Sequence, residues 1–386
     1  MKLEKQTVAI LGSTGSVGQQ SIEVAQHIGA RVDLLMANSN IDTLEGQARL
    51  LRPNTCIVTN EKNALELRSR LADTNIKVFG GEAAALDAIR ESKAEVAVNA
   101  VSGFAGLYPA IACAESGKRI AMSNKEAIVI AHRFLKAEIE KHNAEMIPVD
   151  SEHSAIFQSL QGAGQNQIKK IILTASGGPF RGKTRNELSK ITAKEALSHP
   201  TWKMGPKITV DSASLMNKGF EVIEAVRLFG VSPEQVEVVI HPQSIMHSAV
   251  EYIDNSVIAQ MGAPDMRTCI QYAITYPNRY EPLAKSLDFA QLSSLTFEKP
   301  DMQTFALLPL AFHTIKENGV LPAVLNAADE IAVDAFLKGK IGFVDIFDVV
   351  SSVVYNFKNI KNPTLDDISN ADKEARIRAT ECINAL

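Results

Sequence analysis

The segment TVAILGSTGSVG, residues 7–18, joins a short apolar run to a turn that contains three glycines. A helical pattern follows and continues to about Ile28. A strand, a glycine-rich turn and a helix in this order are typical of a dinucleotide-binding unit. Gly12 would allow the tight turn, Gly15 would let the backbone approach a pyrophosphate, and Gly18 would let helix and strand pack closely. The spacing is GxxGxxG and the common fingerprint is GxGxxG, so a turn that binds no ligand stays open as the alternative.

The same plan of strand, polar turn and helix recurs along the N-terminal part of the chain. Further strands are predicted at residues 32–36, 96–98, 120–122 and 146–149. Their polar turns contain Asn38-Ser39-Asn40, Asn99, Ser123-Asn124-Lys125-Glu126 and Asp150-Ser151-Glu152. Alternating strands and helices of this length predict a parallel sheet that is covered on both faces. Because ligands bind beyond the carboxyl ends of such strands, the polar turns are predicted to share one rim.

The whole chain is predicted to be an α/β protein in three folded parts. Residues 1–149 would form a Rossmann-like, cofactor-binding domain with a parallel sheet. Residues 150–275 mix short strands with long loops, which suits an α+β domain. Residues 276–301 show no clear period and are predicted to be a linker, whereas the apolar residues of 302–386 recur at helical spacing and predict a helical bundle. The strands of the central part are predicted at 170–173, 237–240 and 247–252.

Composition excludes several classes of protein. The chain has 386 residues, of which 46% are hydrophobic and 22% charged, and this is typical of a folded globular protein. Its 40 Lys and Arg residues against 44 Asp and Glu residues give a net charge of -4, with no basic footprint for nucleic acid. The uncharged stretch 96–114 is interrupted by Gly and Pro, so no membrane segment is expected. Four widely spaced cysteines and the absence of an export signal predict reduced thiols and a cytoplasmic location.

The turn after the second strand bears on the choice of dinucleotide. Sites for NAD usually place Asp or Glu there, where the carboxylate binds the ribose 2'-hydroxyl. Here the chain reads Met36-Ala37-Asn38-Ser39-Asn40, without a carboxylate that would repel a 2'-phosphate. This favours NADP, although no lysine or arginine is present to attract the phosphate.

Three carboxylates are candidates for metal ligands. Asp150 and Glu152 are two residues apart at the end of a predicted strand, so in extended backbone they would point to the same side, with Ser151 opposite. Glu221 could supply the third. Three carboxylates without histidine or cysteine suit Mg²⁺ or Mn²⁺ with open positions for substrate oxygens. Acids near a helix start are also common as capping groups, and this alternative stays open.

Two polar segments have the composition of a phosphate site. Ser212, Asn217 and Lys218 combine a hydroxyl, an amide and an ammonium group, of which lysine would supply charge and the others direction. Ser176 opens a second loop of this kind, Ser-Gly-Gly, after the strand at 170–173. A capped helix with a solvated lysine is the alternative for the first segment, and a ligand-free loop is the alternative for the second.

Residues 199–206, HPTWKMGP, contain the only tryptophan of the chain, Trp202. Two prolines and a glycine disfavour a helix there, so the segment is predicted to be a loop. A lid that closes over a bound ligand would explain a loop tryptophan, and an aromatic side chain tucked into the core is the alternative. His241 and His247 are ambiguous, because either could position a substrate or be a buried, hydrogen-bonded histidine.

Taken together, these segments resemble the 1-deoxy-D-xylulose 5-phosphate reductoisomerase family, from residue 12 to about residue 326 and in the family's order. The most specific motifs are SNKE (123–126), PVDSEHSA (148–155), TASGGPFR (174–181), HPTWKMG (199–205), VDSASLMNKGFEVIEA (210–225) and HPQSIMHS (241–248). The resemblance implies a metal site of Asp150, Glu152 and Glu221. It implies substrate contacts from Lys125, Ser151, Glu152, Ser176, His199, Ser212, Asn217 and Lys218. We further predict that Trp202 of the lid and the metal ligand Glu221 contact the substrate, and that Lys125, His199 and the three metal ligands are catalytic. It implies cofactor contacts from Thr14, Gly15, Ser16, Val17, Asn40, Asn124, Glu126 and Gly205. We further predict that Asn38 and Ser39, in the turn after the second strand, contact the cofactor.

The resemblance also implies an activity. Members isomerise 1-deoxy-D-xylulose 5-phosphate and reduce it with NADPH to 2-C-methyl-D-erythritol 4-phosphate, in the non-mevalonate isoprenoid pathway. They need Mg²⁺ or Mn²⁺, with Co²⁺ as a further option, and they are homodimers. Two departures stand out: relatives often have Gly-Lys or Gly-Arg where this chain has Asn38-Ser39, and Ser123 replaces the usual alanine. The first departure predicts weaker binding of the 2'-phosphate.

Two other functions are alternatives. A semialdehyde-type dehydrogenase also uses a GxTGxVG loop, but it acts through a nucleophilic cysteine, and none of the four cysteines is expected in a rim loop or beside a base. A non-catalytic dinucleotide sensor would not need three carboxylates near a phosphate-binding segment.

Overall fold

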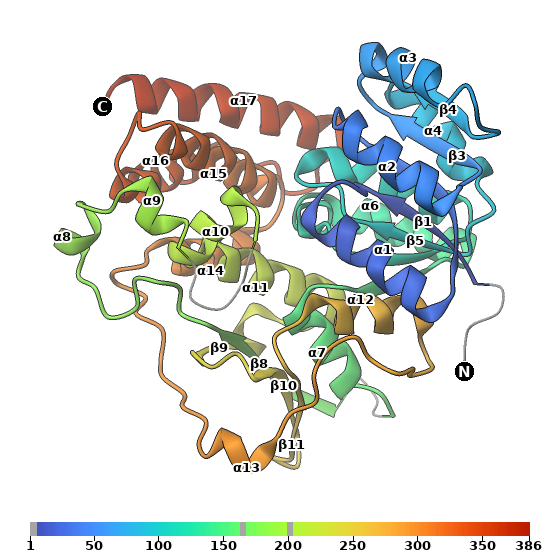
Figure 1. The fold of residues 1–386 in the computed structure, drawn as a ribbon. Coiled ribbons are helices and arrows are strands. Elements are labelled where there is room, and N and C mark those ends of the chain that lie inside the picture. Colours follow the sequence, from blue (N-terminus) through green and yellow to red (C-terminus); the bar gives the residue numbers. More distant parts are fainter. Residues whose placement is uncertain (1–5, 163–166, 199–203) are drawn as a thin grey trace. The chain divides into compact units, whose positions relative to one another are not determined.

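A computed structural model describes residues 6–162, 167–198 and 204–386. The chain divides into two compact units (Figure 1). The first contains Met1–Ala127, His132–Ser154 and Asp265–Ser286, and the second contains Ile128–Ala131, Ala155–Pro264 and Leu287–Leu386. The chain therefore crosses from one unit to the other several times, and each unit is built from segments that are distant in the sequence.

The first unit is built on a parallel sheet of seven strands in the order β4-β3-β2-β1-β5-β6-β7. The strands are β1 Thr7–Leu11, β2 Arg31–Ala37, β3 Thr55–Val58, β4 Lys77–Gly80, β5 Val96–Asn99, β6 Arg119–Met122 and β7 Glu145–Pro148. The predicted parallel sheet is confirmed, and β3 and β4 are additional to the strands expected. Strand order reverses between β1 and β5, which is where ligands bind in sheets of this type.

Helices cover this sheet and follow its strands as predicted. They are α1 Ser16–Ile28, α2 Ile41–Leu51, α3 Glu61–Arg70, α4 Glu82–Glu91, α5 Leu107–Glu115, α6 Lys125–His142 and α12 Met266–Thr275, with α7 Ser151–Ser159 beginning in this unit. α1 packs against α12, and α4 packs against α5. The strands are almost wholly buried, as in Val8, Ile10 and Val98, because a parallel sheet needs cover on both faces.

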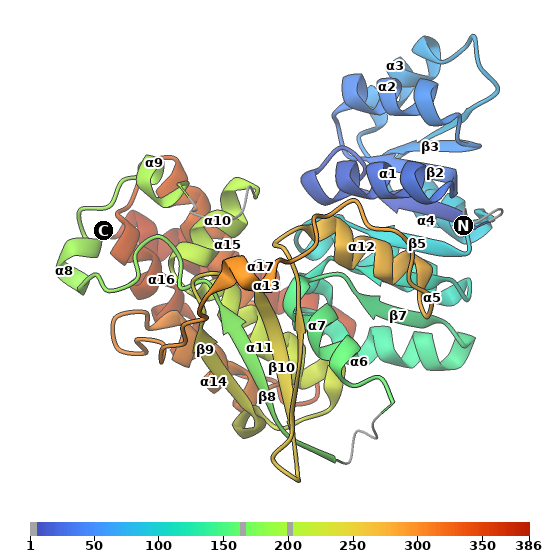
Figure 2. The same cartoon turned by 60° about the horizontal axis from the view of Figure 1, so that its bottom comes forward.

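The second unit contains a mixed sheet of four strands in the order β11-β10-β8-β9. Figure 2 shows its strands β9, β8 and β10 side by side. β8 Ile168–Ala175 lies parallel to β9 Val236–Ile240, whereas β10 Met246–Tyr252 is antiparallel to both β8 and β11 Val257–Met261. β8, β9 and β10 were predicted, and the edge strand β11 was not. A mixed sheet with long connections confirms the α+β architecture expected for this region.

The remaining helices of the second unit include the predicted C-terminal bundle. They are α8 Arg185–Leu188, α9 Ala193–Ala196, α10 Pro206–Ala213, α11 Met216–Phe229, α13 Phe289–Leu292, α14 Leu307–Glu317, α15 Leu321–Leu337, α16 Phe343–Tyr355 and α17 Leu365–Asn384. α15, α16 and α17 pack against one another (Figure 1). The apolar stripe expected on α15 is largely buried, as at Val324 and Ala328. No helix among the described residues is long and apolar enough to span a membrane.

A break in α6 is held by a half-buried arginine. Ala131 leaves the helical conformation (φ -138°, ψ 24°), and Arg227 of α11 donates hydrogen bonds to the carbonyls of Ile128 and Val129. A break of this kind frees carbonyl groups that a continuous helix would use, so the guanidinium replaces their partners. Burial lowers the pKa of Arg227 to about 10.

Candidate active site

The glycine-rich turn after β1 lies at the point where the strand order reverses. Gly12 has a positive φ of 81°, and a Cβ atom there would lie 2.5 Å from the carbonyl oxygen of Ala100, just after β5. A Cβ atom on Gly18 would lie 2.2 Å from the oxygen of Gly12. Both positions therefore exclude any side chain, which confirms the predicted roles of Gly12 in the tight turn and of Gly18 in close packing.

The N-terminus of α1 fits a pyrophosphate. Gly15 is its N-cap, and no side chain among the described residues caps the helix. The first turn contains no acidic residue, and Gly15 and Ser16 are exposed. Unpartnered N–H groups and the positive end of the helix dipole favour an anion at such a position. Thr14, Gly15, Ser16 and Val17 thus form an accessible turn of the expected chemistry.

The turn after β2 is exposed, but two of its three polar side chains already have partners. Asn38 Oδ1 accepts from the Thr59 hydroxyl at 2.9 Å, and Asn40 Oδ1 accepts from Thr43 N at 3.2 Å and thereby caps α2. The Ser39 hydroxyl has no hydrogen-bond partner among the described residues, although its carbonyl accepts from Asn63. Ser39 is therefore the position in this turn best placed to meet a new ligand group.

The turns after β6 and β7 come together at the rim, as predicted. Asn124 caps α6 by accepting from Ala127 N at 2.9 Å, and its Nδ2 donates to Glu126 Oε2 at 2.8 Å. Lys125 begins α6, and its Nζ lies 2.6 Å from Asp150 Oδ2. The Lys125 side chain is largely buried, so a positive charge and a carboxylate are held together at the end of the sheet.

The expected extended backbone at Asp150 and Glu152 is wrong. β7 ends at Pro148 and α7 begins at Ser151, so Glu152 lies in the first turn of a helix. Ser151 does not point away from the acid, because its Oγ donates to Glu152 Oε2 at 2.5 Å. The acids therefore occupy a helix start, as the capping alternative proposed, and this placement is equally compatible with a role as ligands.

The charges of Asp150 and Glu152 act on the thiol of Cys269, which belongs to α12. Burial raises the pKa of its thiol to about 12, Ser154 opposes the shift by a hydrogen bond, and the charges of Asp150 and Glu152 add to it. Cys269 itself lies on a helix and not in a rim loop. A thiol with such a pKa stays protonated at neutral pH, which argues against a cysteine nucleophile.

In the second unit, the Ser-Gly-Gly loop after β8 packs against the end of α10. Ser176 Oγ accepts from Gly178 N at 3.3 Å. A Cβ atom on Gly178 would lie 2.7 Å from the carbonyl oxygen of Ser212 and 3.2 Å from Cα of Ala213. Ser176 and Ser212 are both half-buried, so the two predicted phosphate segments are brought together with their hydroxyl groups partly accessible.

The first turns of α11 hold the other predicted groups. Lys218 Nζ forms an ion pair with Glu221 Oε2, and Asn217 Nδ2 donates to Glu221 Oε1. The side chains of Lys218 and Glu221 are only 4% and 1% exposed. Lys218 is therefore not a solvated surface lysine, and the alternative of a capped helix with a solvated lysine is wrong.

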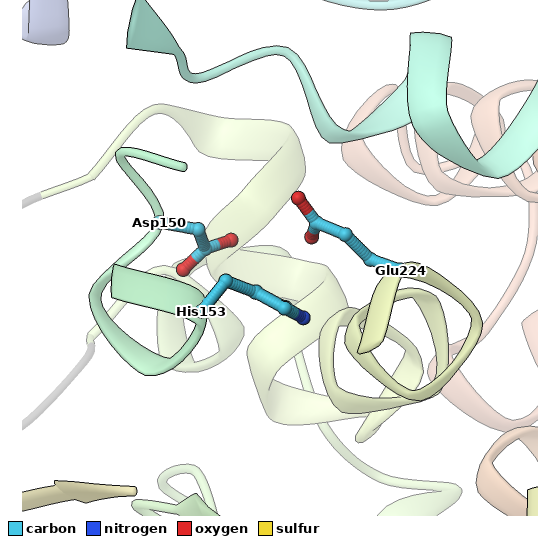
Figure 3. Close-up of side chains that lie close together, drawn as sticks. All are labelled: Asp150, His153 and Glu224. Atoms are coloured by element: carbon cyan, nitrogen blue, oxygen red, sulfur yellow. The ribbon is translucent and has the colours of Figure 1, made fainter. Parts of the chain in front are cut away.

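Two sets of side chains are candidates for metal ligands. One is the predicted set of Asp150, Glu152 and Glu221, and the other consists of Asp150, His153 and Glu224 (Figure 3). The second set was not predicted, although its members neighbour the first set in the sequence. Half-buried Asp150 belongs to both sets. The second set is the more enclosed, because His153 and Glu224 are both buried, whereas the first set combines buried Glu221 with half-buried Glu152. A hard ion with positions open to substrate oxygens fits the three-carboxylate set.

The other predicted residues fall into three groups. His199 and Trp202 lie outside the described residues. Gly205 is the N-cap of α10. His241 is buried, and its Nε2 accepts from the N–H groups of Ile245 and Met246 at 3.2 Å. Its Nδ1 therefore donates to Thr296 O at 2.9 Å. Of the two roles considered for His241, this favours a buried, hydrogen-bonded histidine over one that positions a substrate.

Comparison with known proteins identifies the family. The family model 1-deoxy-D-xylulose 5-phosphate reductoisomerase matches residues 8–132, its C-terminal domain model matches 146–229, and the DXP reductoisomerase C-terminal domain model matches 261–378. Together these models extend over most of the chain and over both units.

Individual relatives agree with the family models. The 1-deoxy-D-xylulose 5-phosphate reductoisomerase of Caldanaerobacter subterraneus is 49% identical over 96% of this chain and 97% of its own length, and that of Phocaeicola vulgatus is 46% identical over 96% and 97%. A solved structure of the enzyme from Zymomonas mobilis in complex with NADPH has a TM-score of 0.92 at 38% identity, covering 99% of this chain and 100% of that one. Another, a DOX-P reductoisomerase in complex with NADPH, fosmidomycin and magnesium, has a TM-score of 0.92 at 36% identity, with 98% of each chain covered. The chain belongs to the 1-deoxy-D-xylulose 5-phosphate reductoisomerase family.

Proposed function

We propose that this protein isomerises 1-deoxy-D-xylulose 5-phosphate and reduces it to 2-C-methyl-D-erythritol 4-phosphate, with NADPH and a divalent metal ion, in the non-mevalonate isoprenoid pathway. The observation that carries the proposal is the pair on α11: a buried carboxylate, Glu221, and a buried ammonium, Lys218, three residues apart. A metal ligand next to a phosphate-binding charge is what a metal-dependent enzyme for a sugar phosphate requires. Family membership and the NADPH and magnesium complexes of relatives support the same conclusion.

The cofactor site proposed lies at the rim of the parallel sheet. NADPH supplies the hydride that reduces the rearranged aldehyde. The turn at the N-terminus of α1 would hold the pyrophosphate, because its N–H groups face an exposed position without competing acids. The 2'-phosphate would lie against the turn after β2. The remaining proposed contacts are Asn124, Glu126 and Gly205.

The metal site proposed consists of Asp150, Glu152 and Glu221. An ion bound there supplies Lewis-acid chemistry, which stabilises negative charge as the carbon skeleton rearranges. Lys125, held 2.6 Å from Asp150, adds a second positive charge next to the reacting oxygens. The three carboxylates supply oxygen ligands, which suit Mg²⁺ or Mn²⁺, with Co²⁺ as a further option.

The substrate phosphate is proposed to lie between the Ser-Gly-Gly loop and the start of α11. Ser176, Ser212 and Asn217 would direct hydrogen bonds to its oxygens, and Lys218 would supply charge. Ser151 would contact the sugar, and His199 and Trp202 would belong to a lid that excludes water. In this division residues 1–149 bind NADPH, 150–275 carry the reaction, 276–301 connect, and 302–386 are structural.

A spectrophotometric assay tests the proposed function. Purified protein with 1-deoxy-D-xylulose 5-phosphate, Mn²⁺ and NADPH should oxidise NADPH, and the rate should vanish when the sugar phosphate is omitted or the metal is chelated. A sensor that only binds the dinucleotide would bind NADPH without oxidising it under any of these conditions, and that result would refute the proposal.

Replacing Ser39 by lysine should strengthen NADPH binding selectively. Ser39 is exposed, and its side chain neither caps a helix nor bonds to a described neighbour. A charge-assisted bond is roughly twice as strong as a neutral one, so Ser39→Lys should lower KM for NADPH and leave KM for NADH almost unchanged. The gain should shrink at high salt, because exposed charges are screened.

Ser39→Gln is the matched control, since it adds length without charge and should leave both Michaelis constants near those of the wild type. Both cofactors are measured with each protein at two salt concentrations. If the wild type already discriminates strongly and the lysine adds nothing, the 2'-phosphate is bound elsewhere, and the proposed roles of Asn38, Ser39 and Asn40 are wrong.

We also propose that the protein is a homodimer, with β11 in the interface. β11 is the edge of the mixed sheet, and Val257 and Ile258 on it are 52% and 49% exposed. An exposed apolar edge strand pairs readily with another chain. A second copy is the proposed occupant, as the family resemblance implies.

Introducing a charge at Ile258 should dissociate this dimer. Light scattering is expected to give the Ile258→Lys variant the mass of one 41.9 kDa chain, at concentrations where the wild type has twice that mass. Leu65→Lys is the control, because Leu65 is equally apolar and 65% exposed but lies on α3. A dimeric Ile258→Lys variant would place the interface elsewhere, and a monomeric wild type would refute the dimer.

The cytoplasmic location remains a prediction that rests on the spacing of the four cysteines in the sequence. Fractionation of the source cells with an antibody to the protein would test it directly.

A further inference from the structure

A buried cluster of three charged side chains joins α10 to α15. Lys207 Nζ lies 2.6 Å from Asp211 Oδ2 and 2.7 Å from Asp329 Oδ2. The side chains of Asp211 and Asp329 are 3% and 0% exposed. Lys207 also lies 4.8 Å from the ring centroid of Phe220 on α11. None of these residues belongs to the proposed metal, substrate or cofactor contacts.

The cluster contains two carboxyl groups and only one ammonium group among the described residues around it. Asp211 Oδ1 and Asp329 Oδ1 are buried, and no described group donates a hydrogen bond to either. Burial raises the pKa of Asp211 well above its ordinary value, and the charge of Asp329 raises it further. A second buried negative charge without a partner would be costly, so one proton is shared between the two carboxyl groups. The cluster is then neutral, with Lys207 balancing the remaining charge.

The position of the cluster connects it to the proposed phosphate site. Asp211 is adjacent in sequence to Ser212, at the end of α10. The backbone of Ser212 and Ala213 packs so closely on Gly178 that even a Cβ atom there would lie 2.7 Å from Ser212 O. A shift of α10 would therefore move the Ser212 hydroxyl relative to the Ser-Gly-Gly loop. Lys207 connects the two elements, because its ammonium group bonds both to Asp211 at this end of α10 and to Asp329 of α15.

We infer that Lys207, Asp211 and Asp329 are positioning residues that fix α10 on α15 and thereby hold Ser212 in register with Ser176 for the substrate phosphate. The inference rests on the proposed function. The three side chains act through Ser212 and do not touch the substrate, so their loss should affect phosphate binding more than the rate of the chemical steps.

Two substitutions of Asp329 test this inference. Asp329→Leu removes the tie to α15 but leaves Asp211 paired with Lys207, so no buried charge loses its partner. It should raise KM for 1-deoxy-D-xylulose 5-phosphate about tenfold, because small displacements of positioning groups have large effects, while kcat changes little. Asp329→Asn keeps the shape, and its amide N–H replaces the shared proton, so this variant should restore KM close to the wild-type value.

Asp372→Leu is the matched control. Asp372 is a carboxylate of similar burial, paired with Arg376 in α17, and its side chain is 10% exposed. Its loss should lower thermal stability without changing KM. Titration calorimetry with inorganic phosphate gives a readout that does not depend on turnover, and phosphate affinity should fall in Asp329→Leu but not in Asp372→Leu or Asp329→Asn.

The outcomes separate the inference from the proposed function. If the wild type does not turn over the sugar phosphate, the proposed function fails. If the wild type is active and Asp329→Leu folds with unchanged KM and phosphate affinity, the cluster is only structural and the inference is overturned. The inference is also overturned if Asp329→Asn raises KM as much as Asp329→Leu does. KM would then rise even though the contact between α10 and α15 is kept.

The shared proton gives an independent measurement. The folded protein holds a proton that the unfolded chain releases above about pH 4, so this pair lowers stability progressively as pH rises through that window toward the raised pKa. Lys207 on α10 and Asp329 on α15 are the charged groups that face Asp211, and α11 contributes the uncharged Phe220. Asp329→Asn needs no such proton, so its Tm should rise relative to the wild type as the pH increases above about 4. A difference in Tm that does not depend on pH would exclude the shared proton.

Discussion

Glu221→Gln is expected to lower kcat about a hundredfold or more while leaving the dissociation constant of NADPH unchanged. The amide keeps the shape of the side chain but removes one negative charge from a site for a hard divalent ion. A bound ion contributes several kcal/mol of charge stabilisation, and each 1.4 kcal/mol or so corresponds to a factor of ten in rate. The measurements are steady-state kinetics over a range of Mn²⁺ concentrations and NADPH binding by fluorescence.

Glu224→Gln provides the matched control for this prediction. Glu224 lies one turn further along α11, and both side chains are only 1% exposed. If Asp150, Glu152 and Glu221 are the ligands, Glu224→Gln should bind Mn²⁺ with nearly wild-type affinity. Loss of Mn²⁺ binding in Glu224→Gln together with near-normal kinetics in Glu221→Gln would assign the ion to Asp150, His153 and Glu224 instead.

Lys218→Ala is expected to raise KM for the phosphorylated substrate strongly. Truncating one partner of a buried charge pair costs about 2–5 kcal/mol, so the substrate phosphate should lose most of the affinity that this ammonium supplies. A substrate analogue that lacks the phosphate should be nearly insensitive to the substitution. Equal loss with both substrates would give Lys218 a role in the chemistry or in folding.

The ion pair of Lys218 with Glu221 calls for a control in this experiment. Removing the lysine also removes a positive charge from a proposed metal ligand, so Mn²⁺ affinity must be measured separately. Because a cation next to the site repels a metal ion, Lys218→Ala should bind Mn²⁺ at least as tightly as the wild type. Weaker Mn²⁺ binding would mean that Lys218 positions Glu221, and the loss of substrate affinity could not then be ascribed to the phosphate.

The parallel sheet was predictable because its strands are buried on both faces. Such strands appear in the sequence as short apolar runs, and the glycines at 12 and 18 mark places where no side chain fits. The edge strand β11 could not be predicted in the same way. Its first three residues are exposed, so neither face produces an alternating pattern of apolar and polar residues.

The local backbone at the candidate metal ligands Asp150 and Glu152 could have been predicted better. Asp150 and Ser151 are residue types that favour a helix start, and a helix does begin at Ser151. The interpretation as a continued strand correctly placed the two acids after the end of β7. It was wrong about the directions of their side chains. The choice between two ligand sets could not be predicted, because His153 and Glu224 become candidates only through the folded structure.

Contacts between distant segments lie beyond what a single sequence reveals. Lys207 contacts Asp329, which is 122 residues away in the sequence. Two buried carboxyl groups and one ammonium form a stable arrangement only when all three are brought together, so none of them is conspicuous on its own. The charged cluster on α10 and α15 therefore emerged from the structure alone.

Transfer of hydride to the proposed product is the most direct test of the central claim. Wild-type protein is incubated with 1-deoxy-D-xylulose 5-phosphate, Mn²⁺ and NADPH that carries deuterium at the transferable position, and the product is identified by mass spectrometry. The account predicts 2-C-methyl-D-erythritol 4-phosphate with one deuterium for each NADPH consumed, and none after chelation of the metal. Oxidation of NADPH without this labelled product, or an unlabelled product, would contradict it.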